Sequence, residues 1–146
     1  MNGVIRPSSG MLSCNSVGVI VRNQEGEYCL LDRRRGVRAW AAPAGHIDEG
    51  EDPRVSVARE LEEETGIRIE TSAFAEVLRC DAYSPCGRGA EFHGWFVYDG
   101  GTVVKDRIEL LEPEKHRGIG WFHPEEMRHL ELEPVWRAFF KRLDII

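Results

Sequence analysis

The sequence predicts a single α/β domain in which helices cover both faces of a mixed β-sheet. Strand-like runs stand on both sides of one strongly marked helix in the middle of the chain, and a second helix is expected near its end. With 146 residues, of which 42% are apolar and 30% charged, the chain can bury one proper core and has no room for a second domain.

Residues 1–13 are rich in Ser, Gly and Asn and are expected to form a flexible lead, so that the domain itself runs from 14 to 146. They lack the basic start and apolar stretch of a signal peptide, and no apolar run is long enough to span a bilayer. A cytoplasmic protein without membrane contacts is therefore favoured. The four cysteines show no C-x-x-C spacing and are expected to be reduced thiols. A zinc site from Cys80, Cys86 and a histidine such as His93 is the alternative.

Runs of β-branched and aromatic residues predict the strands. In chain order they lie at 16–22, 27–32, 75–80, 91–98 and 119–122. A helical turn is expected at 124–127, and a C-terminal helix at 133–143 would carry Val135, Phe139 and Phe140 toward the core.

The central helix is predicted from its ends and its periodicity. Asp52 can cap the first amide groups, Pro53 suits the first helical position, and Gly66 supplies the stop. The apolar stripe is expected to consist of Val55, Val57, Ala58 and Leu61.

Glu60, Glu63 and Glu64 stand at i, i+3 and i+4 on this helix, so their carboxylates share one face. At roughly 5 Å and an effective dielectric of about 20, each pair repels by roughly 3 kcal/mol, and a cation turns that cost into binding. Hard oxygen ligands on a rigid helix suit Mg²⁺, for which Mn²⁺ can substitute. The alternative interpretation of a Glu-rich helix is a solvated acidic face.

Residues 45–67 fill every fixed position of the pattern G-x5-E-x7-R-E-U-x-E-E-x-G-U, where U is aliphatic. The chain therefore resembles the Nudix hydrolase family. The resemblance implies a Nudix-type α/β/α sandwich, a loop-helix-loop catalytic motif and cleavage of a diphosphate linkage.

The resemblance also implies roles for single residues. The metals would be held by Glu60, Glu63, Glu64 and the backbone carbonyl of Ala44, and Arg59 would form a salt bridge with Glu51. Gly45, Glu51 and Gly66 would be structural members of the motif. A metal-activated water would attack one phosphorus, with Glu63 or Glu64 taking its proton. The loop residue His46 is the alternative base.

Outside the motif, Glu112-Pro113-Glu114-Lys115 ahead of Trp121 resembles a segment of Nudix nucleoside triphosphate hydrolases. This implies that Glu114 is a further metal ligand and that Lys115 contacts phosphate. Two further sets of side chains are candidates for substrate binding. They are Arg33 and Arg35 for the phosphates, and Trp40 and Trp95 for stacking on a base, with solvated charges and core packing as the alternatives.

The net charge is −6, and the stretch from Asp48 to Glu64, with eight acidic and two basic residues, accounts for all of it. Binding to duplex nucleic acid is not expected from such a surface. The expected partner is a small-molecule nucleotide, and a monomer and a homodimer are both open. Our prediction for the substrate is a nucleoside triphosphate, including modified or deoxy forms, cleaved to monophosphate and pyrophosphate. ADP-ribose or another nucleoside diphosphate derivative is the alternative, and a non-catalytic nucleotide-binding Nudix module is a third.

Overall fold

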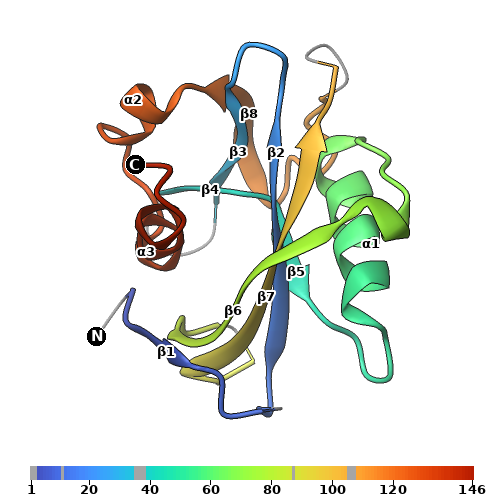
Figure 1. The fold of residues 1–146 in the computed structure, drawn as a ribbon, viewed down its shortest axis with the longest axis vertical. Helices are drawn as coiled ribbons and strands as arrows, with labels where there is room; N and C mark the ends of the chain where they lie inside the picture. The colour runs from blue at the N-terminus through green and yellow to red at the C-terminus, as the bar shows by residue number, and fades with distance from the viewer. Residues whose placement is uncertain (1–2, 11, 35–38, 87, 105–107) are drawn as a thin grey trace.

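The computed structural model describes residues 3–10, 12–34, 39–86, 88–104 and 108–146, and shows a mixed sheet between two helical layers (Figure 1). The strands are β1 (Ile5–Pro7), β2 (Asn15–Arg22), β3 (Tyr28–Arg33), β4 (Ala39–Ala41), β5 (Ala44–His46), β6 (Ala75–Tyr83), β7 (Phe92–Thr102) and β8 (His116–Phe122). The helices are α1 (Pro53–Thr65), α2 (Pro124–Met127) and α3 (Pro134–Arg142), with a 3-10 turn at Thr71–Ala73. The predicted α/β/α sandwich with a mixed sheet is confirmed.

Eight strands form the sheet, in the order β1-β6-β7-β2-β3-β4, with β5 also paired to β2 and β8 to β3. β2 runs parallel to β7 and antiparallel to β5, so it joins the strand that contains Gly45 to the strand that contains Trp95. Because β2 is buried from Ser16 to Val21, it forms the centre of the molecule.

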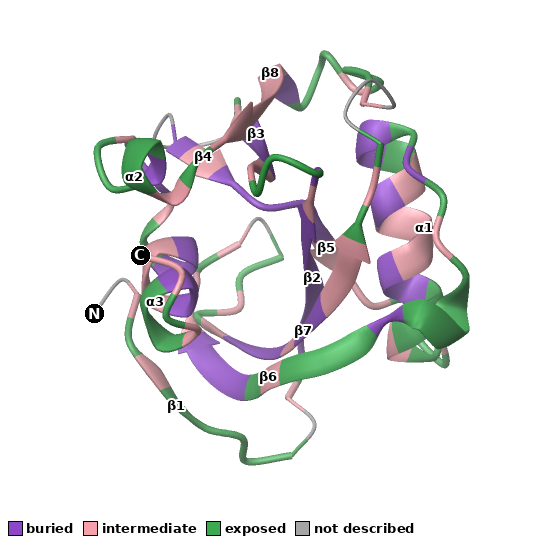
Figure 2. Ribbon diagram, turned by 45° about the horizontal axis from the view of Figure 1, so that its top comes forward, coloured by how far each residue is buried: buried purple, intermediate pink, exposed green. Residues whose placement is uncertain are grey.

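Helix α1 begins and ends where the sequence predicts. The side chain of Asp52 accepts a hydrogen bond from the Arg54 amide, and Gly66 adopts a left-handed conformation while its N–H donates to the carbonyl of Glu62. The predicted apolar stripe is wrong at Val55, which is 47% exposed. The helix instead turns Ser56, Val57, Leu61 and Glu64 inward, because the carboxylate face is itself partly buried (Figure 2).

Two apolar cores lie on opposite faces of the sheet. One packs Val57 and Leu61 of α1 against the valines of β2. The other surrounds Trp136 of α3, with Trp95 and Phe139 packed edge-on against its ring. A Cβ atom at Gly18 would lie 2.4 Å from the Trp136 ring, so glycine lets the indole rest directly on the backbone of β2.

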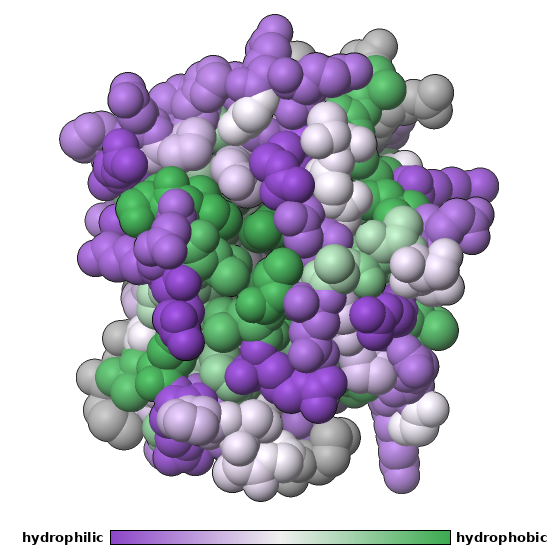
Figure 3. Space-filling view, viewed as in Figure 1, coloured by the Kyte–Doolittle hydropathy of each residue, from purple (hydrophilic) through white to green (hydrophobic). Residues whose placement is uncertain are grey.

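Ile5–Pro7 belong to the stretch that is expected to form a flexible lead, and they pair antiparallel with residues 80–82 of β6. Ser9 continues this attachment, since both its amide and its hydroxyl donate to Asp81. At the other terminus, Leu143, Ile145 and Ile146 pack, partly buried, against the α3 core, and apolar side chains gather on this face of the molecule (Figure 3). Among the described helices, none is both long and apolar enough to cross a membrane.

Candidate functional site

The catalytic loop approaches α1 closely at Gly45. β5 brings this residue against the helix, where a Cβ atom would lie 2.1 Å from the carboxyl carbon of Glu60 and 2.3 Å from its nearer oxygen. A side chain at this position would displace the Glu60 carboxylate, so glycine leaves the space that the carboxylate occupies. The backbone of β5 and the carboxylate of Glu60 therefore form one wall of the site.

Arg59 joins the loop to the carboxylates. Its Nε and Nη2 donate to the two oxygens of Glu51 at 3.0 and 2.8 Å, and its Nη1 donates to Glu60 at 2.9 Å. Ser56 also donates its hydroxyl to Glu51. These hydrogen bonds, from Arg59 first and Ser56 second, lower the pKa of Glu51 to about 2. Both oxygens of Glu51 are thus engaged by protein donors, which fits a bracing role.

The three helix carboxylates differ in their surroundings. Burial, followed by the charge of Glu64, raises the pKa of Glu60 to about 7. Glu64 is 4% exposed; one oxygen accepts from the Ala44 amide at 2.8 Å, and the other lies 3.0 Å from Nε2 of His116. The side chain of Glu63 is 47% exposed and touches Arg59 only at 3.4 Å. Glu63 is therefore the carboxylate most open to solvent.

On the side of β8, Glu64 also belongs to a second group of side chains that could bind a metal. Donor atoms of Glu64, Glu112 and His116 lie within 4.8 Å of one another, and Lys115 Nζ lies 3.1 Å from Glu112. The sequence predicts Glu114 at this place, but Glu114 is exposed, and Glu112 occupies the group. Sequence reasoning missed His116, whose only signal is its position directly after the EPEK run.

The predicted substrate-binding residues separate in the structure. Trp40 is half-buried and packs edge-on against Phe122 at 4.9 Å. Trp95 is 5% exposed and lies in the α3 core, so in this structure it is not available for stacking on a base. Nε of Arg33 lies 3.6 Å from Glu133. Arg35 lies outside the described residues.

The architecture and the motif have counterparts in known proteins. The profile of the NUDIX domain family matches residues 13–143, which is most of the chain. The chain belongs to the Nudix hydrolase family. The resemblance carried by residues 45–67 is thereby confirmed. Nudix hydrolases generally use divalent metal ions, and the described residues include groups that could hold one.

Named Nudix relatives and solved structures agree with this membership. The chain is 40% identical over 103 residues to the RNA pyrophosphohydrolase of Roseobacter denitrificans, which covers 70% of this chain and 54% of the relative. It is 37% identical over 109 residues to Nudix hydrolase 26, chloroplastic, of Arabidopsis thaliana, covering 73% and 43%. The chain thus spans about half the length of these curated relatives. A MutT protein from Methanosarcina mazei Go1 has a similar structure, with a TM-score of 0.73, 28% identity, and coverage of 94% of this chain and 96% of that one.

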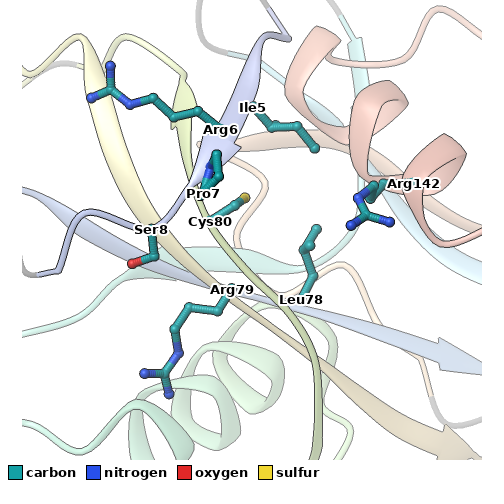
Figure 4. Close-up of a pocket in the computed structure, with 8 residues that line it drawn as sticks. All are labelled: Ile5, Arg6, Pro7, Ser8, Leu78, Arg79, Cys80 and Arg142. Atoms are coloured by element: carbon teal, nitrogen blue, oxygen red, sulfur yellow. The ribbon is translucent and has the colours of Figure 1, made fainter.

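A pocket of about 360 Å³ lies elsewhere, between β1, β6 and α3 (Figure 4). Two of its three arginines already have partners, since Arg6 stacks on Phe92 and Arg79 pairs with Glu76. None of the Nudix carboxylates lines it. The chemistry of the motif, and not the presence of a hollow, therefore locates the candidate active site.

If Glu51 braces the Nudix loop, Glu51→Gln should lower turnover by roughly 10- to 100-fold with little change in metal affinity. Its stability effect should depend on pH. Because the folded protein lowers the pKa of Glu51, its contribution is present above about pH 4.5 and is lost as the pH falls toward about 2. The difference in melting temperature between wild type and variant should shrink across that window. Glu49→Gln, which removes an exposed charge from the same loop, is the control; a loss of metal binding by Glu51→Gln would make Glu51 a ligand.

The raised pKa of Glu60 predicts that its contribution to the stability of the metal-free protein falls as the pH rises, which is the opposite of the Glu51 effect. A carboxyl group whose folded pKa lies near 7 stabilises the fold fully below its ordinary pKa of 4.5, and this contribution is lost as the pH rises through about 7. With a chelator present, wild type should lose melting temperature relative to Glu60→Gln between about pH 5 and about pH 8. Parallel curves for the two proteins would contradict the assignment.

Proposed function

We propose that this Nudix chain hydrolyses a nucleoside triphosphate group to the monophosphate and pyrophosphate, with Mg²⁺ as cofactor and Mn²⁺ as a substitute. The observation that carries the proposal is that Glu60 and Glu64 both meet the β5 backbone, while Arg59, held by Glu51, reaches Glu60 and Glu63. A solvated acidic helix face would leave these carboxylates apart from the loop.

The donor set fits a hard divalent cation. Glu60, Glu63 and Glu64 offer carboxylate oxygens, and the carbonyl of Ala44 would add a neutral one. Burial first and the charge of Glu64 second raise the pKa of Glu60 in the metal-free protein, and a cation would relieve the repulsion between the two carboxylates. When bound, such an ion lowers the pKa of a water ligand and neutralises phosphate oxygens.

The chain's own residues divide the remaining work. Arg59 holds Glu60 in place, while the Ala44 amide and His116 fix the two oxygens of Glu64. Glu63 is our candidate for taking the proton from the attacking water, because its carboxylate is the one open to solvent. His46 is less suited, since burial first and the charge of Arg88 second lower its pKa to about 4. Its ring also faces His93, with 5.5 Å between the ring centroids.

The EPEK run ahead of Trp121 and the names of relatives favour a triphosphate as the substrate. Lys115 and Arg33 are proposed to contact the phosphates, Glu112 to approach the metals from the β8 side, and Trp40 to contact the base. The relatives called RNA pyrophosphohydrolase, including one from Cereibacter sphaeroides at 48% identity over 121 residues, favour a second candidate with the same reacting group, the triphosphate end of an RNA. The Nudix domain of NrtR from Shewanella oneidensis has a similar structure and was solved with ADP ribose. It is only 16% identical to this chain, so it carries no argument about the substrate.

A product assay decides among these substrates. The purified chain is incubated with nucleoside triphosphates, a single-stranded RNA bearing a terminal triphosphate, and ADP-ribose, with Mg²⁺ and with Mn²⁺ at the same pH. We expect pyrophosphate from a free triphosphate, from RNA, or from both, and Glu63→Gln measures the background. Ribose phosphate and AMP formed from ADP-ribose with far higher catalytic efficiency would overturn the proposed substrate. Hydrolysis of none of the three would overturn the proposed reaction.

A further inference from the structure

Four side chains with metal-binding donor atoms meet at one end of the central strands of the sheet. They are Cys14, His46, Cys86 and His93, and their donor atoms all lie within 4.8 Å of one another. Cys14 directly precedes β2, His46 ends β5, His93 lies in β7, and Cys86 lies in the connection between β6 and β7. No two of them are close enough in sequence to form a familiar metal-binding spacing. The sequence suggests Cys86 and His93 together with Cys80, and the topology places Cys14 and His46 beside them instead of Cys80.

The strand pairing explains how the group assembles. Ser16 of β2 pairs with His46, and Asn15 pairs with Gly94, the neighbour of His93. The carbonyl of Cys14 also accepts a hydrogen bond from the Gly94 amide at 3.1 Å. These main-chain contacts bring one end of β2, β5 and β7 together, so three of the four side chains are positioned by the central sheet.

The cysteine in the connection is held by a turn of its own. The Cys86 amide donates to the carbonyl of Ala90, and the Arg88 amide donates to the Cys86 sulfur at 3.4 Å. These two hydrogen bonds fix the position of the Cys86 sulfur within the connection.

The interior of the group is buried and contains an unpaired donor. Cys14 is 6% exposed and His93 2% exposed. Nδ1 of His93 is buried and has no hydrogen-bond partner among the described residues, while its imidazole also makes a hydrogen bond with the backbone of Ser84. A buried nitrogen without a partner costs free energy. A histidine that is held by a backbone group on one side and free on the other has the arrangement of a metal ligand.

We propose that Cys14, His46, Cys86 and His93 form a zinc site separate from the Nudix carboxylates. Two thiolates and two imidazoles are the donors that zinc prefers, whereas the oxygen-only set around Glu60 suits magnesium. Zn–S and Zn–N bonds of about 2.3 and 2.0 Å place tetrahedral donors roughly 3.3–3.8 Å apart, so donor atoms within 4.8 Å of one another need to move closer by no more than about 1–1.5 Å. With four protein ligands the site has no open position, so its role is structural. The zinc would hold Cys86, in the connection between β6 and β7, and His46, which follows Gly45.

Metal content and cobalt spectra test the site without reference to activity. Wild type, expressed with zinc and purified under reducing conditions without chelator, should carry about one zinc per chain, and Cys14→Ser and His93→Gln should reduce this at least about tenfold. Cys80→Ser is the matched control, since Cys80 is another buried thiol outside the group. Co²⁺ in place of zinc should give the intense visible bands of a tetrahedral ion and a thiolate charge-transfer band in wild type and Cys80→Ser only.

Several outcomes separate this proposal from its competitors. Glu63→Gln should keep its zinc, so failure of the proposed hydrolysis leaves this site standing. If Cys14→Ser does not fold, alkylation of native wild type with and without a chelator decides, because Cys86, which is only partly buried, should react much faster once zinc is removed, whereas the buried Cys29 and Cys80 stay protected in both cases. A wild-type protein that takes up no zinc or Co²⁺ under reducing conditions, or that forms a Cys14–Cys86 disulfide instead, would overturn the proposal. Equal loss of metal in Cys80→Ser would do the same.

Discussion

Glu63→Gln is expected to lower turnover by roughly 10²- to 10⁴-fold while leaving the fold intact. The substitution keeps the size of the side chain but removes one negative charge from the metal ligands and removes the proton acceptor. The side chain of Glu63 is 47% exposed, and its recorded partner is Arg59 at 3.4 Å, so little packing is lost. Relief of the repulsion from Glu60 should hold the melting temperature of the metal-free protein at or above the wild-type value.

The same helix provides the control for this measurement. Glu62 lies next to Glu63 in sequence but faces away from the loop, where it pairs with Arg68 at 2.7 Å on the surface. Glu62→Gln removes the same charge from α1 and should keep near-wild-type turnover. Steady-state rates at saturating Mg²⁺, measured with melting curves, make the comparison. Similar activity in the two variants would remove Glu63 from the catalytic group.

Gly45→Ala should have the second large effect. A Cβ atom there would overlap the Glu60 carboxyl group, with 2.1 Å to its carbon, so either that side chain or the backbone of β5 must shift. Overpacking of this kind costs about 1–3 kcal/mol, and a shift of 1 Å near the reacting groups costs roughly 10²-fold in rate. We expect weaker Mn²⁺ binding, slower turnover and a lower melting temperature together.

Gly118→Ala is the matched substitution. A Cβ at Gly118 meets only the Trp40 ring, at 3.5 Å, which is ordinary contact. Mn²⁺ affinity from paramagnetic resonance titrations and unfolding curves in urea should therefore change much less than for Gly45→Ala. If Gly45→Ala binds Mn²⁺ as tightly as wild type, the close approach of loop and helix is not what positions Glu60.

The parts of the site that the sequence predicted are those set by local structure. Helix caps, the glycine stop and the i, i+3, i+4 carboxylates depend on residues within a few turns, so α1 could be placed from Asp52 to Gly66. The motif predicted a salt bridge between Arg59 and Glu51, and in the structure the two side chains share two hydrogen bonds. Val55 was misjudged because apolar periodicity does not reveal that a helix also buries carboxylates.

Contacts between distant segments escaped prediction for a different reason. The pairing of Ile5–Pro7 with β6, the contact of His116 with Glu64, and the group around Cys14 all depend on which strands become neighbours. That choice is made by the packing of the whole sheet. The burial of Trp95 escaped prediction for the same reason, since a tryptophan in a strand fits both the surface of a sheet and the core around Trp136.

The contact between Gly18 and Trp136 has a consequence for how the family can diversify. Gly18 pairs with Ala44 in the sheet while the indole of α3 covers its other side, so one residue of β2 is enclosed by the catalytic loop's strand and by the C-terminal helix. A larger residue at position 18 fits only if position 136 becomes smaller. Among homologous chains the two positions should therefore change together. Once a smaller residue replaces Trp136, larger residues fit at position 18.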